Sequence, residues 1–315
     1  MTLAFVSIIS GIALMWISAE KLEKYSVLAA KQFGLSPFLI GSTIIAFGTS
    51  APEMLTTFFV SLEDQGAMVI GNVVGSNVAN LSLVFGSMLF VVSIKKLSIS
   101  QPKSINTNLL ILLTSSLLVW GVIAVDPFNI ITSIILLIAL LAVILFWYIN
   151  NQEMPDTESE NNSKNSFSKL ILSLMTLVFA AWLITTGANL ILDNFNLGQL
   201  FIGYTVLAIG TSLPEIAASI SLALKGRYEA VAGTLIGSNI FNGLCVLAIP
   251  GLFRSSEMGF GWHYSDWSSL LVILFAITVM FCTYIFVLSK QVRRASLLLS
   301  ILFLSIYFIS LIYAY

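Results

Sequence analysis

The sequence predicts an all-α integral membrane protein with ten transmembrane helices, arranged as two inverted five-helix repeats in which helices 2, 3, 7 and 8 are broken. Hydrophobic residues fill 58% of the 315 positions and charged residues only 9%, whereas soluble domains carry about 25% charged residues. Apolar runs of about 20 residues, the length that crosses a bilayer as a helix, recur along the whole chain. A polar segment divides these runs into two groups of five, and one part of the first group is repeated in the second.

The first half contains five predicted spans. The first has no positively charged segment before it, which favours a retained span over a signal peptide, and a charged bend at 20–31 follows. Span 2 contains Gly48 and Pro52, and span 3 contains several glycines, whereas spans 4 and 5 are uniformly apolar. The predicted spans are 2–19, 36–62, 66–92, 105–125 and 128–149.

A linker at 150–166 separates the halves. It is acidic and lacks aromatic residues, so it cannot build a core and is predicted to be mobile. The halves are 1–149 and 167–315. Because the first half has an odd number of spans, the second enters the membrane in the opposite orientation, as in many secondary transporters. The second-half spans are predicted at 168–192, 198–224, 228–253, 267–289 and 295–315.

Lys and Arg are distributed unevenly between the two sides of this topology. The loops after spans 1, 3, 5, 7 and 9 carry 13 of the 14 basic residues, and only Arg254 lies on the other side. Cytoplasmic loops carry the excess of Lys and Arg. The sequence therefore predicts a multi-pass cell-membrane protein with both termini outside and the linker in the cytoplasm.

Residues 40–84 and 202–246 align without a gap at an offset of 162 positions. Seventeen of these 45 positions are identical, against roughly one in ten expected by chance, which indicates an internal repeat. The first copy contains GTSAPE and GSNVAN, and the second contains GTSLPE and GSNIFN. Each copy places one glutamate directly after a proline, inside an apolar run.

Glu53 and Glu215 are the only two of 15 acidic residues that fall deep in predicted spans, and no Lys or Arg lies at that depth. A carboxylate at mid-bilayer costs at least a few kcal/mol. It must be protonated, hydrated or paired with a cation from outside the protein. Two protonated glutamates that only join helices are the structural alternative, but the duplicated placement favours a shared cation site.

The residues around each glutamate supply oxygen atoms. Pro52 lacks an N–H and clashes with the carbonyl four residues back, so span 2 is predicted to break at 46–50 and to free the Ala46 carbonyl. Pro214 predicts the same for Ala208 in span 7. A helix-capping role for the serines of the two S-x-x-E patterns is compatible with this interpretation. The hydroxyls at these breaks belong to Thr49, Ser50, Thr211 and Ser212.

Spans 3 and 8 are predicted to form the opposite wall. Ser76 and Asn80 are four residues apart and share a helix face, as do Ser238 and Asn242. A GxxxG pattern beside each polar face permits close helix approach. We expect it to bring span 3 against span 2, and span 8 against span 7.

The candidate ligands are all oxygen atoms, which suit Ca²⁺ and Na⁺ rather than soft metals. His263 is interpreted as an interfacial residue, and Cys245 and Cys282 as buried thiols. The net charge of -1 gives no reason to expect nucleic acid. GxSxG and HExxH are absent, so an enzyme is not predicted. The expected partners are small inorganic cations and membrane lipid, with no cofactor and no obligatory protein partner.

The paired motifs resemble the two alpha-repeats of the sodium/calcium exchangers, within the cation/Ca²⁺ antiporter superfamily, in the prokaryotic form without large inserted domains. The resemblance covers effectively the whole chain. It implies antiport of Na⁺ against Ca²⁺ by alternating access, with Glu53 and Glu215 as central carboxylates and spans 1 and 6 sliding across a rigid core. It also implies two flanking Na⁺ positions, one at Ala46, Thr49, Ser50 and Ser76, the other at Ala208, Thr211, Ser212 and Ser238, with Asn80 and Asn242 beside the middle.

Other functions are compatible with parts of this pattern. Buried glutamates can carry protons, so H⁺/Ca²⁺ antiport is the main alternative. A passive channel is disfavoured because inverted repeats with broken helices are typical of carriers. Many relatives carry Asp where this chain has Asn242, and K⁺-dependent members depend on that acid. Asn242 therefore argues against K⁺ co-transport.

Overall fold

The computed structural model describes residues 2–31, 37–97, 105–150, 166–195, 197–253, 268–287 and 296–315, and every regular element in these ranges is helical. The predicted linker lies almost entirely outside them. The first half comprises α1 (Thr2–Lys31), α2 (Pro37–Leu39), the π-helical η1 (Ile40–Ile45), α3 (Ala46–Leu62), α4 (Gly66–Ala79), the π-helical η2 (Asn80–Val84), α5 (Phe85–Ile94), α6 (Ile105–Val125) and α7 (Ile130–Asn150). The second half comprises α8 (Ser166–Phe195), α9 (Gln199–Ile202), the π-helical η3 (Gly203–Leu207), α10 (Ala208–Thr211), α11 (Leu213–Leu224), α12 (Tyr228–Leu244), the 3₁₀ turn η4 (Val246–Ala248), α13 (Ile249–Phe253), α14 (Ser268–Val287) and α15 (Ser296–Ala314).

Ten membrane-spanning rods are recognisable in the described residues. Nine are long and apolar enough to cross a membrane, and the apolar part of α1, Thr2–Ser18, is a shorter tenth. The all-helical fold is thus confirmed. The charged bend predicted at 20–31 is wrong, because α1 continues as a helix to Lys31. This segment alternates Glu and Lys, which are good helix formers, and places Glu20 four residues before Lys24.

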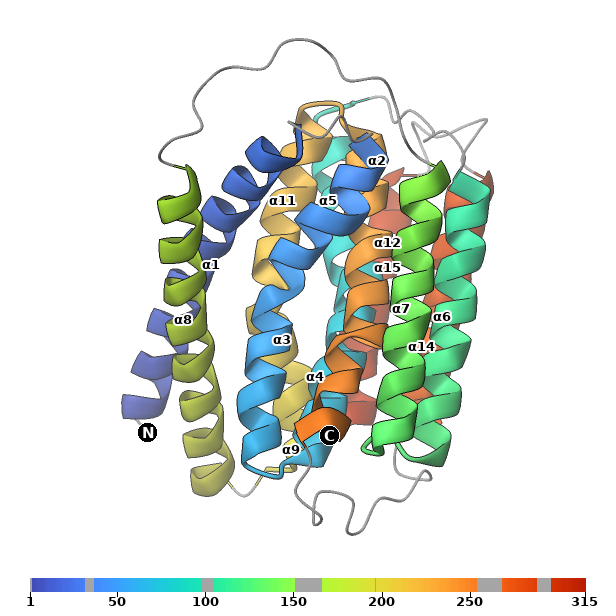
Figure 1. The fold of residues 1–315 in the computed structure, drawn as a ribbon. Coiled ribbons are helices and arrows are strands. Elements are labelled where there is room, and N and C mark those ends of the chain that lie inside the picture. Colours follow the sequence, from blue (N-terminus) through green and yellow to red (C-terminus); the bar gives the residue numbers. More distant parts are fainter. Residues whose placement is uncertain are drawn as a thin grey trace.

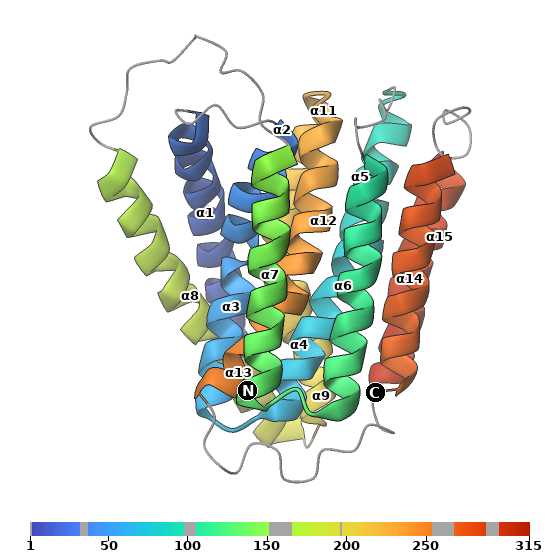
Figure 2. The ribbon, with the colours of Figure 1, turned by 45° about the vertical axis from the view of Figure 1, so that its right-hand side comes forward.

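The two halves run through the molecule in opposite directions. In Figure 1, α1 rises from the N-terminus at the bottom, whereas α8 descends from the top, and both chain termini lie at the bottom. The helices α1 and α8 pack against each other along much of their length. On the other side of the molecule, α14 stands beside α6 and α15 beside α5 (Figure 2). This arrangement is the predicted inverted repeat.

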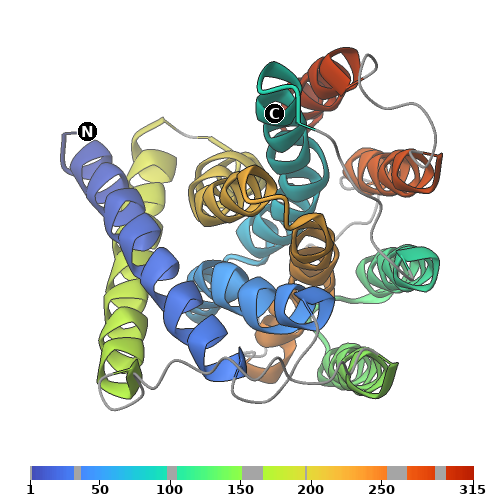
Figure 3. The same cartoon turned by 90° about the horizontal axis from the view of Figure 1, so that it is seen from above.

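The rods that carry the repeated motifs occupy the middle of the bundle. Seen from above, α3, α11 and α12 lie centrally, while α6, α7 and α14 form an outer row (Figure 3). In the membrane span that contains α12, 83% of the apolar segment is buried inside the protein, against 22% in the span formed by α7. The outer helices therefore present most of their side chains to lipid, and the motif-bearing helices form the protein interior.

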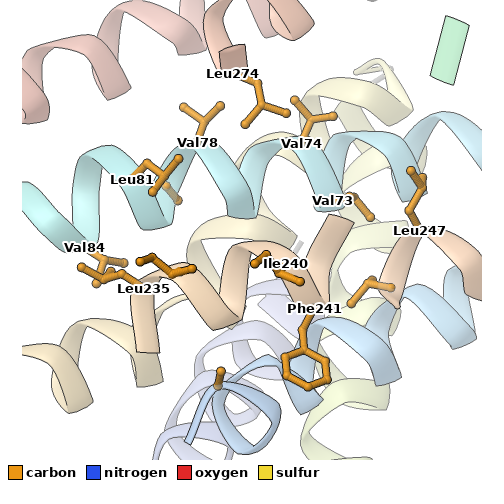
Figure 4. Close-up of a cluster of buried hydrophobic side chains, with 14 of the residues drawn as sticks. Val73, Val74, Val78, Leu81, Val84, Leu235, Ile240, Phe241, Leu247 and Leu274 are labelled. Carbon is orange, nitrogen blue, oxygen red and sulfur yellow. The ribbon is translucent and has the colours of Figure 1, made fainter. Parts of the chain in front are cut away.

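Apolar side chains fill the contact between α4, η2 and α12. Val73 and Val84 of the first repeat lie on the side of Leu235 and Ile240 of the second, and Leu274 of α14 covers the far side of α4 (Figure 4). All five side chains are at most 3% exposed. This packing holds the two repeats together through helices that are 150 or more positions apart in the sequence.

The GxxxG glycines join the two repeats rather than neighbouring spans of one repeat. A β-carbon built on Gly75 would lie 2.8 Å from Cβ of Ala208, in span 7. One built on Gly237 would lie 2.7 Å from Cβ of Ala46, in span 2. The expected partners, span 2 for span 3 and span 7 for span 8, are therefore wrong. The spacing of glycines marks a face for close approach but does not determine which helix fills it.

The contacts of these glycines repeat at the offset of 162 positions. A β-carbon on Gly41 would meet the backbone nitrogen of Thr234 at 3.2 Å, and one on Gly203 would meet that of Asn72 at 3.0 Å. Each of the four residues corresponds to another of them in the aligned repeats. The internal symmetry that the sequence predicts therefore extends to the contacts between the two repeats.

Candidate cation site

Glu53 on α3 and Glu215 on α11 lie at the centre of this arrangement. Both side chains are 0% exposed, and in the described part of the chain no Lys, Arg or Asp is buried with them. Neither carboxylate oxygen of Glu53 has a hydrogen-bond partner. A buried carboxylate in this setting is costly, by a few kcal/mol or more, unless it binds a proton or a cation.

The two glutamates border the same interior region from opposite repeats. Helix α3 contacts both α10 and α11, and the side chain of Thr211 lies next to the carboxylate of Glu53. The Thr211 hydroxyl donates its hydrogen bond to the carbonyl of Leu207, at 3.0 Å. Because Thr211 precedes Glu215 by only four residues, Glu53 faces the segment that carries the second glutamate.

Buried oxygen atoms without hydrogen bonds occur on all four motif-bearing spans. Every residue that the sequence predicts for the site, including Ala46 and Ala208, is at most 1% exposed. Buried polar atoms in proteins almost always have partners, so this concentration needs an explanation. Side-chain polar atoms without a hydrogen bond occur here on Ser50, Ser76, Asn80, Ser212 and Asn242.

This donor set fits a hard cation. Carboxylate, hydroxyl and amide oxygens are the ligands that Ca²⁺ prefers, and they also suit Na⁺. Within the described ranges, no third acidic, histidine or cysteine side chain joins the two glutamates. With both glutamates ionised, the side chains of the site carry a charge of -2.

One hydrogen bond crosses the site between the repeats. The hydroxyls of Thr49 on α3 and Ser238 on α12 are 3.3 Å apart, and Thr49 also lies 3.3 Å from the Ala46 carbonyl. Gly237, next to Ser238, packs against Ala46. Span 8 therefore covers the oxygen-bearing segment of span 2.

The corresponding contact on the other side joins span 3 to span 7. Gly75, next to Ser76, packs against Ala208, and the Ser76 hydroxyl has no hydrogen bond. These contacts differ from the grouping that the resemblance implies for the two serines. Ser238 belongs with Ala46 and Thr49, and Ser76 belongs with Ala208, because each serine lies on the helix that packs against the opposite repeat.

All four motif-bearing rods depart from α-helical geometry, but span 2 does so earlier than predicted. Its π-helical segment η1 precedes Ala46, and α3 then continues through Pro52 as an α-helix. The break predicted at 46–50 is therefore wrong. The missing N–H of Pro52 still deprives the Gly48 carbonyl of its helical donor. Packing of α3 against α8 and α12 keeps the helix continuous around that gap.

Span 7 is interrupted close to the predicted place. The helix α10 ends at Thr211, Ser212 adopts φ -82° and ψ -1°, and α11 begins at Leu213. The Ala208 carbonyl still accepts a hydrogen bond from the Ser212 N–H at 3.1 Å. Span 3 contains η2, which begins at Asn80, and span 8 changes to a 3₁₀ turn after Cys245.

A second layer of buried polar residues, not predicted from the sequence, lies one helical turn beyond the glutamates. In the first repeat, the side-chain amide of Asn72 donates to the hydroxyls of Thr56 (3.3 Å) and Thr57 (3.0 Å). In the second repeat, Ser219 and Thr234 are both 0% exposed. The four-residue spacings from Glu53 to Thr57 and from Asn72 to Ser76 could have indicated this layer.

Comparisons with known proteins identify the family. The model of the family described as sodium/calcium exchanger protein matches residues 3–149 and 165–315. The sodium/calcium exchanger MaX1 of Methanosarcina acetivorans is 23% identical over 89% of this chain and 98% of its own. The uncharacterized membrane protein MJ0091 of Methanocaldococcus jannaschii is 30% identical over 96% of this chain and 94% of its own.

A solved structure of the sodium-calcium exchanger NCX_Mj, soaked with 2.5 mM Na⁺ and 0.1 mM Ca²⁺, has the same fold. Its TM-score with this chain is 0.71, with 26% sequence identity over 98% of each chain. The chain therefore belongs to the sodium/calcium exchanger protein family. It is a multi-pass membrane protein of a family of cation antiporters, which are transporters and not enzymes.

Proposed function

Because the chain belongs to this family, we propose that it is a secondary active antiporter that exchanges Na⁺ for Ca²⁺ across the cell membrane by alternating access. The supporting observation is the pair of fully buried glutamates, one from each repeat, among hydroxyl and amide oxygens that lack hydrogen bonds. Such a site has the charge and the oxygen ligands for hard cations. Na⁺ and Ca²⁺ are nearly equal in radius, so one site can accept either.

In this proposal, Glu53 and Glu215 bind Ca²⁺ and are shared by competing Na⁺. Asn80 and Asn242 lie beside this central position. Two further Na⁺ positions flank it, and each is lined by residues from both repeats. One consists of the Ala46 carbonyl with Thr49, Ser50 and Ser238, and the other consists of the Ala208 carbonyl with Thr211, Ser212 and Ser76.

The charge of the site explains obligatory exchange. One Ca²⁺ neutralises the two carboxylates, whereas Na⁺ ions in all three positions change the charge of the site from -2 to +1. Without a cation, closing the site off from water would bury two negative charges close together, which is strongly unfavourable. The protein therefore reorients only with ions bound, which couples the flux of Ca²⁺ in one direction to that of Na⁺ in the other.

Reorientation is assigned to α1 and α8. These helices pack on each other and contact the core mainly through η1, α3 and α11. Their sliding across the core would expose the site to one side and then to the other. From the distribution of basic residues, both termini face outside and the linker faces the cytoplasm.

Uptake of ⁴⁵Ca²⁺ into proteoliposomes tests the proposal. Vesicles loaded with Na⁺ and diluted into Na⁺-free medium are expected to accumulate Ca²⁺, and vesicles with equal Na⁺ on both sides are not. Uptake that does not depend on the Na⁺ gradient, but is driven by a pH gradient in the absence of Na⁺, would instead establish H⁺/Ca²⁺ exchange. Addition of K⁺ is expected to leave the rate unchanged, because Asn242 supplies no additional carboxylate.

A further inference from the structure

The second polar layer differs between the two repeats. Aligned at the offset of 162, Thr57 corresponds to Ser219 and Asn72 corresponds to Thr234. In the first repeat, the amide nitrogen of Asn72 reaches the Thr57 hydroxyl at 3.0 Å and joins α4 to α3. The amide oxygen of Asn72 remains without a partner.

In the second repeat, both side chains are smaller, and neither hydroxyl has a hydrogen-bond partner. Ser219 on α11 and Thr234 on α12 are 0% exposed, and their hydroxyl oxygens have no hydrogen-bond partner. The two helices pack against each other. Thr234 and Asn72 occupy corresponding positions. The backbone nitrogen of Thr234 lies beside Gly41, and that of Asn72 lies beside Gly203, the residue that corresponds to Gly41.

Two buried hydroxyls without partners are costly, at about 1–3 kcal/mol each. Replacing Asn by Thr also removes the amide group that fills this place in the first repeat. Buried waters typically make about three hydrogen bonds to polar groups that otherwise lack them. We propose that Ser219 and Thr234 form a binding site for one water molecule, present in the second repeat and replaced by the Asn72 amide in the first.

The position of this site gives the water a role in transport. Ser219 follows Glu215 by four residues, so both lie on one face of α11, one turn apart. In Figure 1, α11 rises from the centre toward the top of the molecule. The water therefore lies on that side of Glu215, where it can hydrate a cation that leaves or approaches the carboxylate. This role rests on the proposed function, whereas the water site itself does not.

The site can be tested with a structure at a resolution that shows ordered waters. The wild-type protein is expected to show water density between the hydroxyls of Ser219 and Thr234. Thr234→Asn supplies the amide of the first repeat and is expected to remove this density. Asn72→Thr is the matched control, and it is expected to create water density beside Thr57. Absence of the wild-type density, or its persistence in Thr234→Asn, would overturn the site.

Transport rates test the role. Thr234→Asn is expected to lower the maximal rate of ⁴⁵Ca²⁺ uptake about tenfold, an increase in the barrier of about 1.4 kcal/mol, with little change in the Ca²⁺ concentration for half-maximal rate. Thr234→Ser keeps the hydroxyl and is expected to match the wild type. A wild-type rate in Thr234→Asn would refute the role of the water in transport. The existence of the water site would still be decided by the water density. If Ca²⁺ uptake by the wild type does not depend on Na⁺, the proposed function fails. The water density between Ser219 and Thr234 still shows whether the water site exists.

Discussion

The two copies of the GTS-x-PE motif adopt different backbones. In the first repeat, α3 runs as one helix through Pro52, and the Thr49 hydroxyl is hydrogen-bonded to Ser238. In the second repeat, the helix is interrupted at Ser212, and the Ser76 hydroxyl that corresponds to Ser238 has no hydrogen bond. Nearly identical residues therefore form a hydrogen bond between the repeats on one side of the site and no such bond on the other.

This difference is compatible with the alternating access proposed above. An inverted repeat can exchange the conformations of its halves, so that the side that is open in one state is closed in the other. The contacts of the glycines, by contrast, are the same in both repeats. The glycine contacts that hold the repeats together are therefore symmetric, whereas the candidate ligands and the second polar layer differ between the repeats.

The glutamates are expected to produce the largest effect and to be equivalent in spite of the asymmetry. Glu53→Gln and Glu215→Gln each remove one of the two negative charges, so one Ca²⁺ would no longer be neutralised. Each variant is expected to abolish Na⁺-dependent ⁴⁵Ca²⁺ uptake in proteoliposomes. Glu63→Gln is the matched control, at an exposed acidic residue just after α3, and it should keep transport because glutamine can still accept the hydrogen bond from Asn189 of α8. Substantial uptake by either buried variant would contradict a site shared between the repeats.

The glycines of the frame are expected to have an intermediate effect, again equal in both repeats. A β-carbon at residue 75 or 237 would lie within 2.9 Å of atoms of the opposite repeat. Gly75→Ala and Gly237→Ala should therefore each destabilise the protein by about 1–3 kcal/mol through overpacking. The melting temperature of each variant in detergent measures this loss of stability. Gly121→Ala, where a β-carbon meets nothing within 4 Å, should leave the melting temperature unchanged or slightly higher, and an equal loss there would refute the contact.

The smallest effect is expected from the serines, where the repeats should differ. In ion-free protein, Ser238→Ala removes the hydrogen bond to Thr49 and should cost about 0.5–1.5 kcal/mol, whereas Ser76→Ala breaks no hydrogen bond. The melting temperature should fall only for Ser238→Ala. With saturating Na⁺, both variants lose a ligand and both should be less stabilised by the ion. Equal melting temperatures without ions would mean that the asymmetry does not persist in solution.

Much of the fold could be predicted from the sequence, because it depends on local patterns. Apolar run lengths, the offset between the repeats and the positions of Glu53 and Glu215 all lie in the sequence itself. The partners of the GxxxG glycines could not be predicted, because their spacing is the same whichever helix they meet. The pairing of Ser238 with Thr49 follows from that long-range packing and was missed for the same reason.

Two local predictions failed because neighbouring residues outweighed a single signal. Pro52 was expected to break span 2, but the packing of α3 between α8 and α12 preserves the helix around it. The charges of residues 20–31 were expected to form a bend, yet they form the last turns of α1. The division at 150–166 and the roles of the predicted site residues remain predictions that direct experiments must test.

Equilibrium binding of Ca²⁺ to the purified protein, titrated against Na⁺, tests the central claim most directly. We predict one Ca²⁺ per chain at the paired glutamates, displaced by Na⁺ with a dependence steeper than first order, and lost in Glu53→Gln while the variant remains folded. Ca²⁺ binding that Na⁺ cannot displace, or that persists unchanged in Glu53→Gln, would contradict a site in which the two buried carboxylates serve both ions.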